Sequence, residues 1–439
     1  MLRRYAAIGA VSLLVLAGCS DGGESEPRRS PAPSTPKSAA PSPSPRAAFD
    51  PPTRFGPQGA ALPAEASENT IGGGDAPVRP LPVTLHRTTA FIASTTALLA
   101  VDTITGRTLA TIAPTAGTTQ APTGTTPGGT DPARTDAARA PLVWTDNGRA
   151  TVLATFVVDR PAKGTQKAGR AIEIVAVDAE TVKSLWTAQV EAPAGLDQGY
   201  AGLAADPIGV DAGTLAVGVT YQTAQGVVAV DLATKQARWS RADFRPGVVT
   251  SGVVVGATGD PLSDPSSVLA LDLADGKQKW SALPGSQQLI VSSVGPALLI
   301  ATGKNYGSGD TLVASLDVAT GKVRDRSAAD YSSVRCQFDG KDVTVCGRSG
   351  WAVGLDSTTG KTLWELPDRA GTRVAPRIAA AWHGAVYGTT DNGPVVLDAR
   401  SGKDREIAPG LAPLVVNEYV GIGLPPNGGE GVRAYPAAQ

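Results

Sequence analysis

Short apolar runs that end in aspartate recur along this chain, and each is followed by a polar turn and a second short run. In Ser267–Trp280, SVLALDLADGKQKW, an apolar segment ends at Asp272, Gly276 and Lys277 occupy a turn, and the next segment ends at Trp280. Short segments rich in β-branched and apolar residues, bounded by turn signals, are typical of strands buried within stacked sheets. The pattern therefore predicts an all-β protein.

The layout occurs seven times, with the aspartates at Asp102, Asp178, Asp231, Asp272, Asp317, Asp356 and Asp398. From Asp231 onward they are spaced by 41, 45, 39 and 42 residues, whereas the two earlier gaps, 76 and 53, contain insertions. Tryptophan stands eight positions after the aspartate in four copies, namely Trp186, Trp239, Trp280 and Trp364. A period of about 42 residues, with about four strands a unit, is typical of a β-propeller blade.

Each repeated residue has a structural role that explains its position. Aspartate carboxylates accept hydrogen bonds from backbone N–H groups just ahead and so begin a turn. Glycine, present four positions after the aspartate in five copies, supplies the positive φ that a β-branched residue resists. We expect each tryptophan to lay its ring against a neighbouring repeat.

The C-terminal part predicts how the ring closes. Residues 413–424 and 431–435 supply three strands after the last marker and no fourth. A propeller commonly closes by pairing its two termini in one blade, and residues from about 60 to 80 are candidates for the missing strand. The sequence thus predicts four-stranded blades, eight of them and closed by pairing of the N- and C-terminal strands, with seven blades as the alternative.

The N-terminus predicts export. Arg3 and Arg4 precede an apolar run, and Leu16-Ala17-Gly18-Cys19 resembles the lipobox of bacterial lipoproteins, in which the cysteine receives diacylglycerol and becomes the new N-terminus. We therefore expect a signal peptide over residues 1–18, lipidation of Cys19, and a mature protein outside the cytoplasm, anchored to a bacterial membrane through its lipid. An ordinary signal peptide that happens to contain a cysteine is the alternative.

Residues 19–48 predict a disordered tether, because Ser20–Ala48 holds seven Pro and seven Ser in 29 residues and few large apolar groups. The folded domain should then span residues 49–439. Residues 111–140 hold nine Thr with several Pro and Gly, which predicts a disordered insertion between blades, with glycosylation or partner binding as alternatives.

Net charge, histidines and cysteines limit the functions that the chain can have. A formal net charge of −1 provides no field for attracting nucleic acid or anionic lipid. Of the two histidines, His383 follows Trp382 and is expected to be packed or exposed rather than a catalytic base. Cys336 and Cys346 flank a hairpin centred on Asp339-Gly340, so in an exported protein they should form a disulfide, with two buried thiols as the alternative.

The marker, written x-V-x-A-L-D-x-x-T-G-K-x-x-W, closely resembles the repeat of the pyrroloquinoline-quinone-like, quinoprotein-type β-propellers, including the outer-membrane assembly lipoproteins. The best matches are Val268–Trp280 and Ala352–Trp364, and the resemblance covers roughly residues 81–435. It implies the propeller, whereas quinoprotein dehydrogenases also need a vicinal disulfide and a Ca²⁺ site. Cys336 and Cys346 lie ten positions apart, so that vicinal pair is absent.

These features favour a membrane-anchored, monomeric scaffold that binds a protein or envelope component and needs no cofactor, metal or catalytic residue. The alternative is an enzyme with a site in the central funnel, for example a dehydrogenase that uses pyrroloquinoline quinone with Ca²⁺. A third hypothesis is that the propeller binds a small envelope ligand without turning it over.

Overall fold

The computed structural model describes residues 46–67, 81–117, 140–165, 167–196, 203–221, 224–259, 265–293, 295–327, 334–426 and 428–439. The predicted signal peptide, Cys19 and most of the predicted tether lie outside these residues, as do positions 118–139 of the predicted insertion. The described chain, Arg46–Gln439, forms one unit by itself. None of its helices has the length and apolar character that crossing a membrane requires.

The described strands pair into antiparallel sheets, most of them formed by four strands that are consecutive in the chain. The first is β3 (Val83–His86), β4 (Thr89–Ala93), β5 (Leu98–Asp102) and β6 (Thr108–Ile112). The second is β7 (Leu142–Asp146), β8 (Arg149–Arg160), β9 (Gly169–Asp178) and β10 (Ser184–Val190). The third is β11 (Leu203–Asp211), β12 (Thr214–Tyr221), β13 (Ala224–Asp231) and β14 (Gln236–Ala242).

Two further sheets of this kind follow later in the chain. One is β22 (Arg335–Phe338), β23 (Val343–Arg348), β24 (Trp351–Asp356) and β25 (Thr362–Leu366). The other is β26 (Arg377–Trp382), β27 (Ala385–Thr390), β28 (Gly393–Asp398) and β29 (Asp404–Glu406). The predicted all-β class and its four-stranded antiparallel sheets are thereby confirmed. One strand differs from expectation, because Thr111 and Ile112, placed in the insertion, complete β6.

A seven-stranded sheet lies between these two groups and contains β15 (Phe244–Thr250), β16 (Val253–Thr258), β17 (Ser266–Asp272), β18 (Gln278–Ser293), β19 (Leu298–Asn305), β20 (Thr311–Asp317) and β21 (Val323–Ser327). The long β18 serves two units, because Trp280 near its start pairs with Ala270 of β17 and Val291 near its end pairs with Ala301 of β19. Divided within β18, the sheet supplies two units of four strands. The count of eight blades, with seven as the alternative, stays a prediction.

The remaining sheet brings the two ends of the described chain together. It contains β30 (Val415–Val416), β31 (Val420–Gly423) and β32 (Arg433–Ala438) with β1 (Arg54–Phe55) and β2 (Ala60–Ala61), and the 3₁₀ helix η1 (Ala64–Ser67) follows β2. Both N-terminal strands pair with β32. Only β2 falls within the range in which the missing strand was expected. β1 has just two residues, too few to form a recognisable strand pattern.

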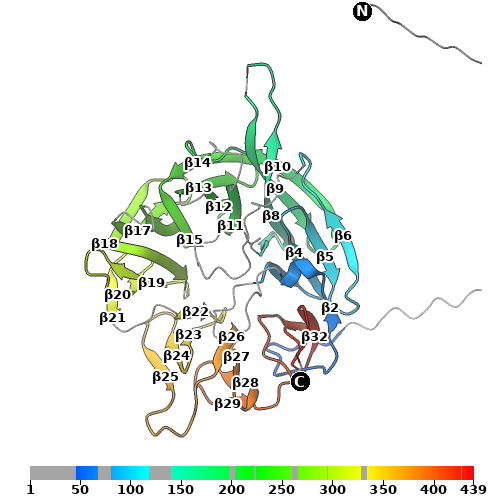
Figure 1. Cartoon of the computed structure of the whole chain (residues 1–439), viewed down its shortest axis with the longest axis vertical. Helices are drawn as coiled ribbons and strands as arrows, with labels where there is room; N and C mark the ends of the chain where they lie inside the picture. Colours follow the sequence, from blue (N-terminus) through cyan, green and yellow to red (C-terminus); the bar gives the residue numbers. More distant parts are fainter. Residues whose placement is uncertain are drawn as a thin grey trace, which may run out of the picture. The chain divides into compact units, whose positions relative to one another are not determined.

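Within Arg46–Gln439 the sheets follow one another around a centre in chain order, as Figure 1 shows. The first strands, such as β11, β15, β22 and β26, lie toward the middle, and the last strands, such as β6, β14, β25 and β29, lie at the outside. The apolar core fills the space between neighbouring sheets: Phe91 of one sheet, for example, joins Val152 and Val177 of the next in a single buried cluster. Each sheet therefore depends on its neighbours for stability.

The turns after the first and the third strand of a sheet lie on the same face of the protein, which we call the turn face. The residue after each third-strand aspartate donates its backbone N–H to the preceding turn, as Leu273 does to Gly252 O at 2.9 Å and Ala399 to Gly384 O at 2.9 Å.

Candidate functional site

The repeat aspartates form the turns that join third and fourth strands. Each of the seven is the last residue of its strand, and its side chain accepts backbone N–H groups two or three residues ahead, as Asp231 does from Ala233 and Thr234 at 2.8 Å each. The residue four positions on closes the turn by donating its N–H to the aspartate carbonyl, as Gly276 does to Asp272 at 2.8 Å. The carboxylates are thus used by the fold.

Several of these aspartates also pair with an arginine or lysine side chain, and together with the hydrogen bonds of the turn this lowers their pKa. Asp178 accepts backbone and hydroxyl hydrogen bonds from Thr181 and an ion pair from Arg149 at 2.8 Å. The bonds from Thr181, followed by that from Arg149, lower the pKa of Asp178 from 3.8 to about 2, against the opposing effect of burial. In Asp317 it is first the hydrogen bond from Arg324 that lowers the pKa. A carboxylate whose pKa is lowered is ionised near neutral pH and is a poor general acid.

Three repeat tryptophans bind the turn of the next unit. Trp239, Trp280 and Trp364 donate their indole N–H to the carbonyls of Leu273, Val318 and Ala399, at 3.0, 2.9 and 2.7 Å. Each acceptor is the residue directly after a repeat aspartate, so the ring covers the glycine of that turn. The fourth, Trp186, faces Lys235, whose ammonium lies 5.6 Å from the ring centroid. In the repeat, Lys235 stands at the position where other copies have glycine.

The two remaining cysteines are joined. Cys336 of β22 lies directly across from Cys346 of β23, and a disulfide links them. Cys346 is 3% exposed and packs with Leu298 and Val353, so the bridge is part of the core. Repeat aspartates, repeat tryptophans and this disulfide therefore explain how the sheets hold together, and a binding site must use residues outside the repeat.

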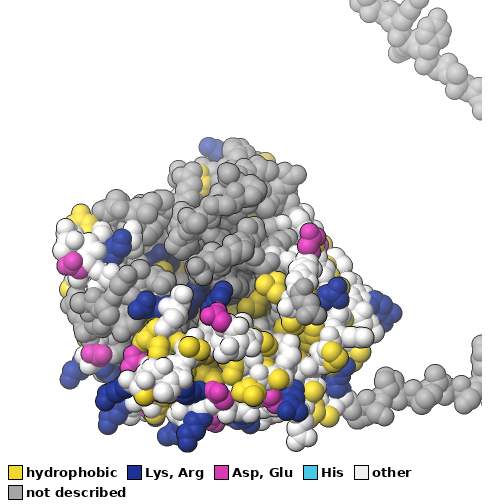
Figure 2. Space-filling model, turned by 60° about the horizontal axis from the view of Figure 1, so that its bottom comes forward, with side chains coloured by type: hydrophobic (Ala, Val, Ile, Leu, Met, Phe, Trp, Pro, Cys, Tyr) yellow, Lys and Arg dark blue, Asp and Glu magenta, His cyan; other side chains and the backbone are white. Residues whose placement is uncertain are grey.

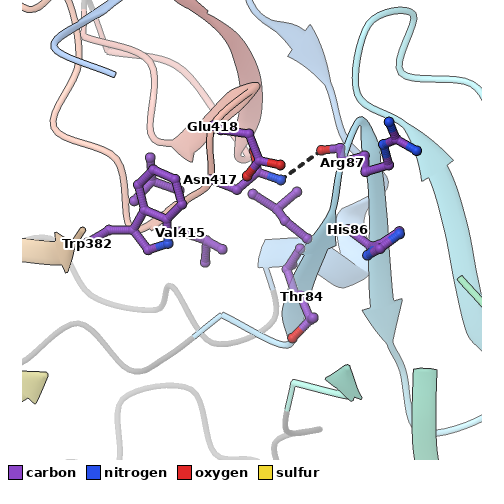
Figure 3. Close-up of a pocket in the computed structure, with 10 residues that line it drawn as sticks. Thr84, His86, Arg87, Trp382, Val415, Asn417 and Glu418 are labelled. Atoms are coloured by element: carbon purple, nitrogen blue, oxygen red, sulfur yellow. Dashed lines mark hydrogen bonds between the residues drawn. The ribbon is translucent and has the colours of Figure 1, made fainter. Parts of the chain in front are cut away.

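A pocket of about 410 Å³ on the inner strands meets that condition. β3 and the residue that follows it contribute Val83 to Arg87, β30 and the β30–β31 turn contribute Val415 to Glu418, and Trp382 is the last residue of β26. Figure 3 shows Trp382 and Val415 on one side and Thr84 and His86 on the other. The pocket thus joins three neighbouring sheets at the turn face.

Asn417 fixes the shape of this pocket. Its side chain is 8% exposed; its amide donates to Arg87 O at 2.8 Å, and its carbonyl oxygen accepts the N–H groups of Tyr419 and Val420 at 3.0 Å each. The dashed line in Figure 3 marks the bond to Arg87. This single side chain therefore forms the β30–β31 turn and attaches it to β3.

Glu418 follows in the same turn and is only half-buried. Its backbone carbonyl accepts the N–H of Phe49 at 2.8 Å, which holds the residue in place from the N-terminal segment. Among the described residues no hydrogen bond or ion pair reaches its carboxylate. The pocket therefore offers a carboxylate whose backbone is fixed and whose oxygens are unpaired by the described chain.

His86 and Arg87 point the other way. Both contact Glu180 in the turn of the next sheet, at 2.9 and 3.3 Å. The hydrogen bond from His86, followed by the charge of Arg87, lowers the pKa of Glu180, and Tyr419 with Glu180 raises the pKa of Arg87. The positive charge beside the pocket is thus compensated by a neighbouring carboxylate.

Trp382 is supported from behind by His383. The two rings stack at 3.9 Å between centroids and 10° between planes, and the His383 Nδ1 lies 2.5 Å from an oxygen of Asp50. The His383 N–H donates to the carbonyl of Asp339, whose own side chain is fully buried. His383 is therefore a packed residue that orients Trp382.

The arrangement is suited to recognition. It combines apolar walls, one indole, one unpaired carboxylate and a fixed backbone, which is the usual composition of a binding pocket. No group of three or more His, Cys, Asp or Glu side chains placed to hold a metal occurs among the described residues. Three of the repeat tryptophans, Trp239, Trp280 and Trp364, use their N–H groups in bonds to the next unit.

The sequence predicts the repeat residues and the cysteine pair, but it does not mark Asn417 and Glu418 as part of a pocket. The available signal was the segment VVNEYV within 415–420, where an asparagine between two apolar pairs indicates a tight turn. Nothing in that segment indicated that the turn would meet β3 and Trp382, because those residues are far away in the chain.

Comparison with known families gives a match over more than half of the chain. A family model described as "Outer membrane protein assembly factor BamB" matches residues 65–282 and 170–334. No curated protein sequence matches the chain.

Solved structures similar to this one share little sequence identity with the chain. The Dos1 propeller shares 11% identity with a TM-score of 0.42, covering 70% of this chain and 75% of that one. Sqt1 of Saccharomyces cerevisiae shares 8% with a TM-score of 0.43, covering 89% and 100%. Hydrazine synthase of Kuenenia stuttgartiensis shares 14% with a TM-score of 0.39, covering 75% and 98%.

Proposed function

We infer a function from the premise that this chain belongs to the family of β-propellers with the pyrroloquinoline-quinone-like repeat, whose model is described as outer membrane protein assembly factor BamB. The predicted repeat family and propeller fold are thereby confirmed. Membership in a fold family does not assign an activity, because propellers serve many functions.

We propose that the protein is an extracytoplasmic lipoprotein whose propeller acts as a non-catalytic scaffold for a protein or another envelope component. The observation that carries the proposal is the pocket between β3, β26 and the β30–β31 turn, which presents an unpaired carboxylate and an indole on a fixed backbone. The family description supports a protein partner, since an assembly factor acts on other proteins.

The anchor belongs to the same proposal. Leu16–Cys19 matches a lipobox, and the folded unit begins at Arg46, so a segment of 26 residues separates Cys19 from it. At about 3.1 Å per residue such a segment reaches at most about 80 Å, enough to hold the propeller clear of a membrane surface. Cys19→Ser should release the protein from membranes while leaving its unfolding midpoint unchanged.

The surface around the sheets suits a scaffold. Figure 2 shows charged side chains of both signs interspersed with hydrophobic ones on one face. Large hydrophobic side chains are exposed on the described surface, among them Val374 at 62% and Ile407 at 74%. Such side chains contribute to protein contacts when a partner covers them.

Cross-linking on intact cells tests the proposal. A photo-reactive residue placed at Arg87 or Tyr419, beside the pocket, should capture a reproducible partner, and one placed at exposed Lys277 in a distant sheet should capture it less. Capture of no partner from either position under any growth condition would contradict the scaffold function. Turnover of an alcohol or sugar on adding pyrroloquinoline quinone and Ca²⁺ would favour the enzymatic alternative instead.

A further inference from the structure

The pocket at the turn face holds one combination of side chains that the fold does not use as a pair. These are the Trp382 ring and the Glu418 carboxylate. Both residues line the same pocket, and in the view of Figure 3 Glu418 lies between Trp382 and Arg87. The other polar side chains there have partners, since Asn417 bonds Arg87, Thr84 donates to Pro141 O, and His86 contacts Glu180.

Charge at the pocket favours a cation. With the histidines counted as neutral, the lining residues Arg87 and Glu418 and the contacting Glu180 sum to one net negative charge, because Arg87 and Glu180 cancel. Behind Trp382, the negative charge of Asp50, which is bonded to the His383 ring, is offset by Lys341, whose ammonium donates to the His383 carbonyl at 3.1 Å. The Glu418 carboxylate is therefore the one uncompensated charge among these groups, and a cation would pair with it.

The shape of the pocket favours a cation on an apolar stem. Val415, Val416 and Leu85 provide apolar contacts, and an aromatic ring attracts a cation placed over its face. Arginine and lysine side chains have this form, a methylene stem with a charged end. A carboxylate can bind a guanidinium through two parallel hydrogen bonds, which gives direction as well as strength.

We propose that this pocket receives an arginine or lysine side chain of a partner protein, with the charged group between the Trp382 ring and the Glu418 carboxylate. The proposal rests on the proposed scaffold function and names the chemistry of its partner. The fixed turn makes the site ready for binding, because Asn417 and Phe49 hold the Glu418 backbone before any partner arrives.

The test titrates the full lipidated chain in detergent with the acetylated, amidated tripeptide Gly-Arg-Gly and with the same peptide carrying neutral citrulline. Calorimetry should show binding of the arginine peptide at least tenfold tighter than that of the citrulline peptide. Glu418→Gln should weaken the arginine peptide at least tenfold, as expected when a charge-assisted pair is lost. Asp275→Asn, an exposed carboxylate on the same face, should change nothing.

Two results would overturn the proposal. One is equal affinity, or none, for the two peptides in the wild-type protein; the other is wild-type affinity in Glu418→Gln. Trp382→Phe keeps an aromatic ring and is therefore expected to fold normally. Its affinity for the arginine peptide should fall less than that of Glu418→Gln. Binding of a chitobiose disaccharide that depends on Trp382 and ignores Glu418 would assign the pocket to a glycan.

The same variants separate this inference from the scaffold function. If Glu418→Gln cross-links to its cellular partner as well as the wild type does, the pocket assignment fails and the scaffold function stands. If the wild type captures no partner, the scaffold function itself fails.

Discussion

The indole ring of Trp280 lies over the backbone of Gly321 in the following unit, so closely that a Cβ at position 321 would be 2.3 Å from the ring. The same ring donates its N–H to Val318 O in that turn, at 2.9 Å. Gly321 also has φ near +68°. One glycine thus satisfies two demands, a left-handed backbone and space for a neighbouring ring.

Gly321→Ala should therefore destabilise the protein by about 2–4 kcal/mol, since a strained backbone adds to displacement of a buried ring. Gly360 provides the matched control: its φ is +72°, but a Cβ there meets its nearest neighbour, Leu298, only at 3.4 Å. Gly360→Ala should cost about 1 kcal/mol. Urea unfolding midpoints of both variants measure the difference, and equal losses would show that the ring contact is unimportant.

Trp280 itself is 9% exposed, which makes it the next test of the contact between units. Trp280→Ala should cost about 3–5 kcal/mol, because a large buried side chain is lost and Val318 O loses its donor. Trp280→Phe keeps most of the apolar area and should cost markedly less. A loss below 1 kcal/mol in the alanine variant, measured by chemical unfolding, would contradict this packing.

The repeat was predictable because its chemistry is local. Asp272 and Gly276 form a turn with residues a few positions away, and the strands on either side show it in their apolar pattern. The packing of Trp280 on the next unit was predictable too, because the repeat itself places successive units side by side. β1 was missed because two residues carry no strand pattern.

The candidate site was beyond sequence reasoning for a physical reason. Asn417 and Arg87 meet across 330 positions, and Trp382 comes from a third sheet. Their proximity is set by how neighbouring sheets pack, and no repeat spacing reports which inner-strand residues face one another. Asn417 also resembles an ordinary turn residue, and only the structure shows that its side chain joins two sheets.

Acid should reveal the role of the Asp178 turn. The folded-state pKa of about 2 lies below the ordinary value of 3.8, so the stabilisation from ionised Asp178 is complete above about pH 4 and is lost as the pH falls through about 2. Asp178→Asn should therefore be less stable than the wild type at pH 6, and the gap should shrink toward pH 2. The exposed Asp146→Asn in the same sheet serves as control. A gap that is constant with pH would refute the ionic contribution.

Reduction should expose the contribution of the Cys336–Cys346 disulfide. The cysteines are ten residues apart, and closing a ring of that size stabilises a fold by about 3 kcal/mol in the loop-entropy model. The double variant Cys336→Ser, Cys346→Ser should lose about that amount under oxidising conditions. Adding dithiothreitol should lower the wild type toward the variant. The variant has no bridge, so dithiothreitol should leave its stability unchanged. If the stability of the wild type is equally unchanged by dithiothreitol, the bridge contributes nothing measurable.

Val182 offers a test of backbone strain at one of the repeat turns. It stands where five other copies carry glycine, and its φ is +59°, a conformation that a β-branched residue adopts only under strain. Its N–H closes the turn by donating to Asp178 O at 2.9 Å, so the turn cannot relax without losing that bond. Val182→Gly should therefore be more stable than Val182→Ala by about 1 kcal/mol, since only glycine is unstrained there. At Lys183, the exposed residue that follows, the order should reverse, with alanine above glycine. Denaturant midpoints of the four variants decide the matter, and an alanine variant of Val182 that equals or exceeds the glycine variant would refute strain at this turn.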